Sequence, residues 1–339
     1  AEAVLSKRTF GKKALDEFLS IANAPRALVA SADLSAPLRQ GIMLGPGHPK
    51  EFFGGLVPMV RAFTSESFAR ATDEALRARP TFALAEKANL YLAPLSSRAA
   101  SLSSHEEAYM SRLVERLPWV RSSQRAYVTY LNKLRADVFD TLIAGWERSG
   151  KPVTEENARS LADFINKASG RGSLGKSNLG PAVNAVFFAP RLVLSRIQAP
   201  TKLLTATWEV RKTVVKDMVA FFVGGITGLT MLELSGAVDV EHNPLSSDFG
   251  RVRIGPTRLD FWGGEQPLAR FIAQMLTGLR KALSTGEIHD ISRPDTAERF
   301  FRSKLAPAPS LLYDYYKGNN FFGGDINAEE EALKTVTPI

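Results

Sequence analysis

The sequence of 339 residues contains no cysteine and only four histidines. Without cysteine the chain can form neither a disulfide framework nor a thiolate metal site, which fits a reducing compartment. The histidines also lack the close spacing of metal ligands, since they stand at His48, His105, His242 and His289. We therefore expect no metal ion and a fold that depends on its own hydrophobic core.

Runs of like charge are missing too. Lys and Arg outnumber Asp and Glu by 43 to 35, which gives a net charge of +8, yet no five consecutive residues carry the same charge. Such a diffuse excess favours anionic partners, either nucleic acid or an acidic membrane surface, without selecting one of them. No base-reading motif occurs, so DNA contact is expected to be nonspecific and to weaken steeply with salt.

The two ends of the sequence lack the usual terminal signals. The first residues, "AEAVLSKRTF", start at Ala1 and show no signal-peptide pattern, and the last, "LKTVTPI", show no obvious helix cap or tail. We expect the sequence to be a fragment of a longer chain.

Helical periodicity dominates the sequence. Over 125–150 apolar residues recur at steps of three and four, with Lys133, Arg135 and Asp137 off the apolar stripe. Similar patterns predict helices over 51–80, 155–170 and 266–283, the second of them capped by Thr154.

One stretch alternates with the period of a strand. Apolar and charged residues alternate on both sides of Gly255-Pro256, which predicts a β-hairpin near 251–262 that packs Trp262 and one set of apolar side chains against helices. No strand–helix–strand alternation occurs, which argues against a doubly wound sheet.

These patterns predict a mainly α, multi-helix assembly module with one small β-hairpin. We expect an N-terminal helical region over 1–150, a helix followed by a Gly/Pro-rich connection over 151–200, and a C-terminal helical region over 201–339. The last region would contain the hairpin and an apolar helix.

Residues 170–177, "GRGSLGKS", match the phosphate-binding loop pattern G-x-x-x-x-G-K-[ST]. A working loop of this kind follows a buried strand and opens a helix. Here an amphipathic helix precedes it, and Gly180-Pro181 would break a helix after it. We expect a glycine-rich connection that ends a helix and binds no nucleotide, with Lys176 as a surface charge.

Other catalytic patterns are weak. Ser173-x-x-Lys176 lacks the companion motifs of serine–lysine enzymes, and no G-x-S-x-G elbow occurs. Adjacent carboxylates such as Glu155-Glu156 fall in a predicted first helical turn, where the helix dipole explains them. The sequence thus predicts no enzyme and no cofactor.

The segment 215–238 is the most unusual. Met218 to Leu232 is fifteen residues without a charge, which is short of the roughly 20 apolar residues of a membrane span. One interpretation is a membrane or oligomer helix whose Gly224 and Gly228 allow close packing against another helix. The other is a core helix covered on every side. The candidate helix-packing or membrane-facing residues are Phe221, Phe222, Gly224, Gly228 and Leu229.

Several segments share their sequence character with one family. They are "SADLSAPLRQG" (31–41), "RAYVTYLNKLRADVFD" (125–140), "INKASGRGSLG" (165–175), "AVNAVFFAPRLVLSRIQ" (182–198), "SSDFGRVRIGPTRLDFWGGEQPLARFIAQMLTGLRKALSTG" (246–286) and "RSKLAPAPSLLYDYYKGNNFFGG" (302–324). Together they resemble the large polyvalent proteins of bacteriophages. The resemblance implies a virion component, packaged inside the head and delivered with the DNA, and it implies that the "GRGSLG" turn is structural.

The expected function is that of a bacteriophage virion structural protein, an internal or ejection protein that helps to form a conduit through the host envelope. Its partners would be copies of itself and portal, tail or other ejection proteins, with nonspecific DNA contact and conditional membrane contact. It would be located in the virion and, after ejection, in the host cell envelope. The alternatives are a static capsid- or portal-associated protein, a DNA-packing protein and a nucleotide-binding enzyme that uses 170–177.

Overall fold

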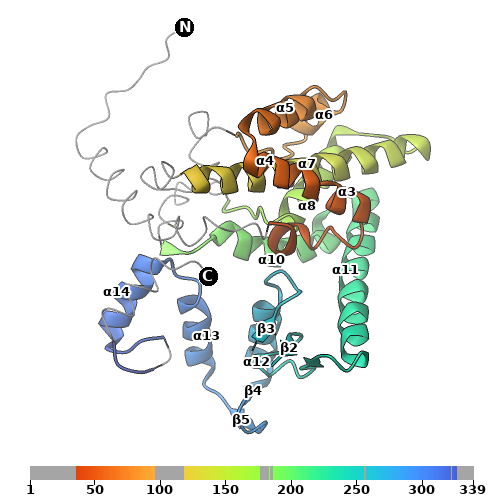
Figure 1. Ribbon diagram of the computed structural model, residues 1–339. Coiled ribbons are helices and arrows are strands. Elements are labelled where there is room, and N and C mark those ends of the chain that lie inside the picture. The colour runs from red at the N-terminus through yellow and green to blue at the C-terminus, as the bar shows by residue number, and fades with distance from the viewer. Residues whose placement is uncertain are drawn as a thin grey trace.

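A computed structural model describes residues 36–95, 118–175, 183, 186–255, 257–321 and 323–326. Over these residues the fold is mainly α with a few short antiparallel strands, which confirms the predicted fold class. Figure 1 shows a group of helices from the first two thirds of the chain, with smaller helices and strands from the last third below it.

The first group contains nearly all of the long helices. It comprises η1 (Pro37–Gly41, a π-helix), α3 (Pro49–Gly54), α4 (Leu56–Thr64), α5 (Glu66–Arg77), α6 (Phe82–Lys87), α7 (Pro118–Arg148), α8 (Glu155–Ala168), α10 (Pro190–Thr205) and α11 (Trp208–Leu234). Their boundaries follow local chemistry. Thr154 caps α8 by accepting a hydrogen bond from the Asn157 amide, as predicted, and α7 is followed by Gly150 at φ +67°.

Helix α7 lies at the centre of this group, in contact with η1, α3, α4, α5 and α8. Its buried side chains are not only apolar, because Arg135, which the helical pattern places off the apolar stripe, is fully buried. The guanidinium donates to Ser169 Oγ at 2.7 Å, to the Ser169 carbonyl at 3.1 Å and to the Tyr91 carbonyl at 3.3 Å. Arg135 therefore ties α7 to the end of α8 and to the segment after α6.

The last third of the chain builds two small sheets and three helices. In chain order these are β1 (Asp239–Val240), β2 (Val252–Ile254), β3 (Thr257–Leu259), α12 (Gln266–Thr277), β4 (Leu279–Lys281), β5 (Ile288–Asp290), α13 (Arg293–Arg302) and α14 (Pro307–Lys317). All the pairings within the sheets are antiparallel, with the orders β1-β2-β3 and β4-β5. A buried ion pair between Arg302 and Asp314, at 2.6 Å, joins α13 to α14.

The predicted hairpin is confirmed as β2 and β3, with Ile254 opposite Thr257. Gly255 at φ +57° begins its turn, and Pro256 lies outside the described residues. The packing prediction is only partly right. Val252 is buried and Trp262 packs on α11, but Ile254, Leu259 and Phe261 are at least 40% exposed. The hairpin also gains a third strand, β1, that the sequence did not indicate.

The predicted helix over 266–283 is wrong at its C-terminal end. Helix α12 stops at Thr277, because Gly278 adopts the left-handed conformation at φ +74°. The following residues form β4, which pairs with β5 in a second hairpin. In this segment the turn residue overrides the continuing apolar pattern.

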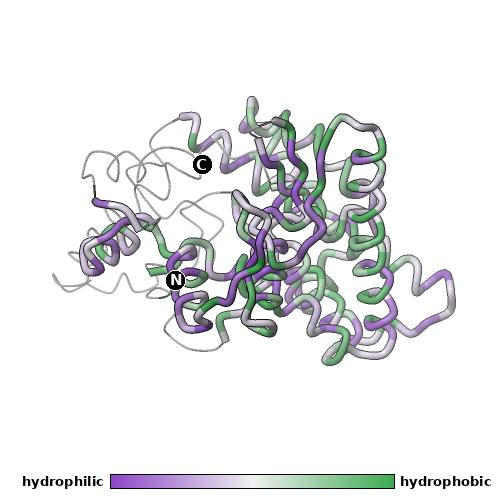
Figure 2. Tube along the Cα trace, turned by 90° about the horizontal axis from the view of Figure 1, so that it is seen from below, coloured by the Kyte–Doolittle hydropathy of each residue, from purple (hydrophilic) through white to green (hydrophobic). Residues whose placement is uncertain are grey.

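The largest hydrophobic core runs continuously across the region boundaries predicted at 150 and 200. It includes Leu44 before α3, Leu134 of α7, Leu161 of α8 and Val214 of α11. A smaller cluster in the last third joins Leu229 of α11 to Val240 and Val252. Helix α11 is therefore shared by both. In Figure 2, hydrophobic and hydrophilic residues are interspersed along most of the trace.

Candidate functional site

The loop after α8 uses its backbone amides within the chain. Helix α8 ends at Ala168, and Gly170 at φ +85° turns the chain, so the predicted helix-terminating loop is confirmed over 170–175. The amides of Gly170 and Arg171 bond back to α8, and the Gly172 amide donates to the Arg191 carbonyl at 3.1 Å.

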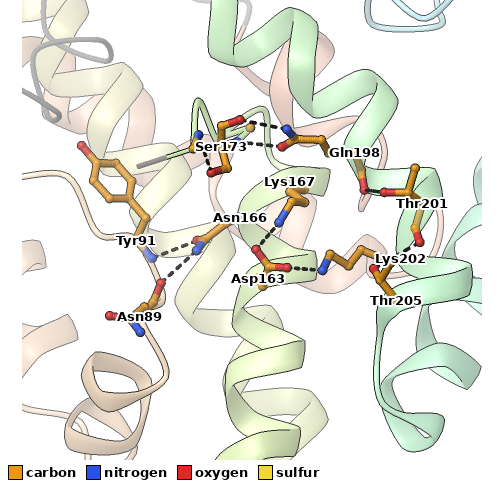
Figure 3. Close-up of polar contacts among 12 residues, drawn as sticks. Asn89, Tyr91, Asp163, Asn166, Lys167, Ser173, Gln198, Thr201, Lys202 and Thr205 are labelled. Carbon is orange, nitrogen blue, oxygen red and sulfur yellow. Dashed lines mark hydrogen bonds and ion pairs between the residues drawn. The ribbon is translucent and has the colours of Figure 1, made fainter. Parts of the chain in front are cut away.

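The next part of the loop is fastened to α10. Gln198 accepts a hydrogen bond from the Ser173 amide at 2.7 Å and donates one to the Ser173 carbonyl at 2.8 Å (Figure 3). The Gly175 amide donates to Ser173 Oγ at 3.2 Å. A phosphate-binding loop needs such amides free and convergent, and here those of 170–173 and 175 are occupied. Lys176 and Ser177 lie outside the described residues.

Gly172 is the closest point between this loop and α10. A methyl group at Gly172 would come within 2.5 Å of the Arg191 carbonyl oxygen and 2.6 Å of the Ser195 nitrogen. Gly172 is not one of the two motif glycines, which are Gly170 and Gly175, and its role is close packing between two backbone segments.

The apolar segment 215–238 belongs to α11, which runs from Trp208 to Leu234, so a helix is confirmed over most of the predicted range. Figure 1 shows α11 at the edge of the molecule, running from the helical group toward the strands. By length and composition it is the one described helix that could cross a membrane, and 22% of its most apolar 18-residue window is buried.

The inner side of α11 is anchored by a buried polar pair. Asp217 and His48, from the turn before α3, lie 3.0 Å apart through Oδ2 and Nε2, and both are almost fully buried. The other carboxylate oxygen, Oδ1, is buried and has no hydrogen-bond partner among the described residues. A methyl group at Gly47 would come within 2.5 Å of that oxygen, so only glycine leaves room for the carboxylate. The partners are 169 positions apart in the sequence, which explains why the sequence alone did not indicate this pair.

Farther along α11, Trp262 forms the second attachment. Its indole packs edge-on against Phe221, with ring centroids 5.7 Å apart, and lies tilted against Phe222 at 6.3 Å. Its Nε1 donates to the Gly250 carbonyl at 2.9 Å, which fixes the ring. A methyl group at Gly225 would come within 2.7 Å of the ring, so Gly225 is the glycine that permits close packing.

The other two glycines have no such close neighbour among the described residues. Gly224 meets only Pro46, at an ordinary contact distance of 3.4 Å for an added methyl group, and Gly228 has open space around it. Neither glycine packs against a second described helix, because the close approach falls on Gly225 and an indole ring. Of the remaining predicted residues, Phe221 and Leu229 are buried and Phe222 is 45% exposed.

The side of α11 that points away from the molecule is apolar and exposed. We call it the outer face and define it by Val215, Val219, Phe222 and Ile226, whose exposed fractions are 47%, 53%, 45% and 58%. At 100° per residue these four positions fall within one sector opposite the buried Asp217. The interpretation of this segment as a core helix covered on every side is therefore wrong for the chain by itself.

An apolar groove of about 350 Å³ lies beside the outer face. Phe222, Ile226 and Leu229 line it from α11, and Val240, Phe249 and Trp262 line it from the opposite side. Glu265 and Gln266 also line the groove. Burial raises the pKa of the Glu265 carboxyl from 4.5 to about 7, although Arg196 at 3.4 Å acts in the opposite direction. The Gln266 side chain is buried, and its Oε1 has no hydrogen-bond partner among the described residues.

A second cavity, of about 450 Å³, lies between β1–β3 and β4 and is lined by Arg251, Arg253, Arg258 and Lys281. Neighbouring carboxylates neutralise most of this positive charge. Arg251 and Arg258 pair with Asp248, and Lys281 lies 2.6 Å from Glu241. This paired arrangement differs from the free cations that bind phosphate groups.

Elsewhere, the described residues contain no group of three or more His, Asp or Glu placed to hold a metal ion. The outer face of α11 and its adjoining groove thus form the candidate functional site. No protein-family model, curated protein or solved structure matches this chain.

Proposed function

We propose that this chain is a non-enzymatic structural protein of a bacteriophage particle that assembles with other protein chains through the outer face of α11. The single observation that carries the docking role is the exposure of Val215, Val219, Phe222 and Ile226 on one side of a long helix. Contiguous exposed apolar surface of this kind is typical of interaction sites. The phage setting rests on the sequence resemblance to the large polyvalent proteins.

A protein partner fits this face better than a lipid bilayer. The charge-free stretch Met218–Leu232 is about 22 Å long at 1.5 Å per residue, shorter than the roughly 30 Å of a hydrocarbon core. In addition, the inner side of α11 carries the buried Asp217, which is paired with His48. A spanning helix would have to break that pair and carry the carboxylate toward lipid, which is costly.

Within the particle, we propose that the chain is an internal protein that leaves with the DNA and helps to form the conduit through the host envelope. Antibody detection of the chain in purified particles, before and after DNA release, tests this setting. We expect it to be present before release and depleted afterwards. Retention after release would favour the static capsid- or portal-associated alternative, and absence from particles would overturn the phage assignment.

The docking role has its own test. Val219→Glu places a charge at the middle of the outer face and should prevent incorporation into particles without unfolding the chain. Leu312→Glu is the matched control, because Leu312 is 72% exposed on α14, away from α11. Equal incorporation of both variants would show that the outer face of α11 is not the docking surface.

A further inference from the structure

We infer that the partner of the outer face is the same face of a second copy of this chain, with the two α11 helices antiparallel. The inference rests on the docking role proposed above and names its partner. A two-fold dimer of this kind requires a self-complementary surface, in which each contact occurs twice.

The spacing of the outer face meets this requirement. Its four apolar residues follow steps of four, three and four, which is the alternation of core positions in coiled coils. They are also placed symmetrically along the helix. Val219 and Phe222 lie equally far from the midpoint between Ala220 and Phe221, and so do Val215 and Ile226. Two antiparallel copies centred at this midpoint would pair Val219 with Phe222 and Val215 with Ile226, twice each.

The charges at the two ends of the face select the antiparallel direction. Lys212 lies on the outer side before Val215 and is 50% exposed, and Glu233 lies on the same side after Ile226 and is 39% exposed. Antiparallel pairing brings Lys212 within about one turn, roughly 6 Å along the axis, of Glu233 of the partner subunit. Parallel pairing would instead place Lys212 beside Lys212 and Glu233 beside Glu233 of the two copies, so like charges would repel. Antiparallel helix dipoles add to this preference.

Both charged side chains remain available for such a contact. Lys212 Nζ lies 3.4 Å from Glu209, and Glu233 lies 2.9 Å from His242, but all four side chains are partly exposed, so these are surface ion pairs that contribute little. The groove lined by Phe222 and Ile226 continues the apolar surface sideways and gives the partner helix a concave edge to pack against.

Cysteine crosslinking tests the register directly, because the natural chain has no cysteine. We would mix Val215→Cys chains with Ile226→Cys chains under mild oxidation. The expected product is the mixed disulfide, with little disulfide from either variant alone, because identical positions would be about 16 Å apart along the antiparallel helices. A disulfide needs Cα atoms within about 7 Å. Dominant crosslinking of Val215→Cys with itself would overturn the antiparallel arrangement.

A charge-exchange series tests the end contacts. Lys212→Glu and Glu233→Lys should each weaken dimer formation about tenfold, since each alters two symmetric pairs, and the doubly exchanged chain should recover the parent affinity. Sedimentation equilibrium gives the dissociation constants. If the loss of dimerisation free energy in the double variant equals the sum of the losses in the two single variants, the predicted contact is contradicted.

The two proposals fail in different ways. A chain that stays monomeric in solution, yet loses particle incorporation with Val219→Glu, would overturn the dimer and leave the docking role intact. A chain that dimerises as predicted, but is incorporated normally with Val219→Glu, would overturn the docking role in particles. Binding of the monomer to vesicles of anionic phospholipid, abolished by Val219→Glu, would identify lipid as the partner and overturn the dimer.

Discussion

Helices α7 and α11 are the two longest described helices, with 31 and 27 residues. Their burial is the reverse of what their composition suggests. Helix α7 is the more polar of the two, yet it is buried on several sides, and its buried side chains include the polar Arg135 and Asn132. Helix α11 is the more apolar, yet its outer face is exposed. Burial is decided by how many elements surround a helix, and α7 is surrounded whereas α11 lies at the edge (Figure 1).

The largest loss of stability is expected from a change at the buried Arg135 of α7. Arg135→Ala should lower the free energy of unfolding by about 4 kcal/mol, because it leaves a cavity and removes the hydrogen bonds to Ser169 and to the Tyr91 carbonyl. Arg148→Ala, at the exposed end of α7, should change it by less than about 0.5 kcal/mol. Urea unfolding measures both, and similar values for the two variants would refute a central role for Arg135.

Beside α11, burial of the Glu265 carboxyl disfavours its charged form, and this makes the free energy of unfolding depend on pH. Because burial raises the pKa of Glu265 from 4.5 to about 7, the folded state holds the proton more tightly than the unfolded state. This contribution is fully present below pH 4.5 and is lost as the pH rises through 7, a change of about 3 kcal/mol.

The variant Glu265→Gln cannot ionise, so its stability should fall less between about pH 5 and pH 8 than that of the parent chain. Urea unfolding across this range supplies the measurement. Glu287→Gln, at a side chain that is 70% exposed, serves as the control and should keep the parent profile. Parallel profiles for the parent and Glu265→Gln would rule out the titration of this carboxyl.

Within α11, Gly225 lies on the side that packs against Trp262, so a substitution there tests that contact. Gly225→Ala should destabilise the chain by about 2 kcal/mol, because its methyl group would clash with the Trp262 ring, which Phe221 and the Gly250 carbonyl hold in place. Thermal unfolding of the parent and the variant measures this loss. A neutral effect would mean that Trp262 can shift and is not a fixed attachment.

Gly228→Ala should have the smallest effect and the opposite sign. The position is helical with open space around it, so alanine should stabilise the chain by about 1 kcal/mol through helix propensity alone. The same unfolding experiment detects it. Destabilisation by Gly228→Ala would indicate a close neighbour at that position and would restore the packing role that the G-x-x-x-G spacing first suggested.

The sequence predicted the parts of the fold that depend on local chemistry. Helical periodicity, the Thr154 cap and the turn at Gly255 all act over a few residues. The cap and the turn appear as predicted, whereas the helical pattern over 51–80 is divided into α3, α4 and α5. The end of α12 was missed because the apolar pattern continues past Gly278, although that glycine was itself the available signal.

Contacts between distant segments could not be predicted in this way. The burial of Arg135 depends on Ser169 and Tyr91, and the anchoring of α11 depends on His48. For the candidate site, the sequence indicated the helix and Phe222, but it did not indicate Gly225, where the close approach to Trp262 lies. Which glycine approaches a neighbour depends on where Trp262 arrives, and no periodicity within α11 encodes that.

The position of α11 between two hydrophobic clusters has a mechanical consequence. Helix α11 contributes Val210 and Val214 to the core around α7, and Leu229 to the cluster of Val240 and Val252. It therefore connects the two clusters directly. A force applied to its outer face would reach both clusters along one helix, because Asp217 and Trp262 hold the middle of that helix to the rest of the chain. A neighbour bound to this one helix is therefore connected to both hydrophobic clusters, and a force that it exerts would act on the two clusters together.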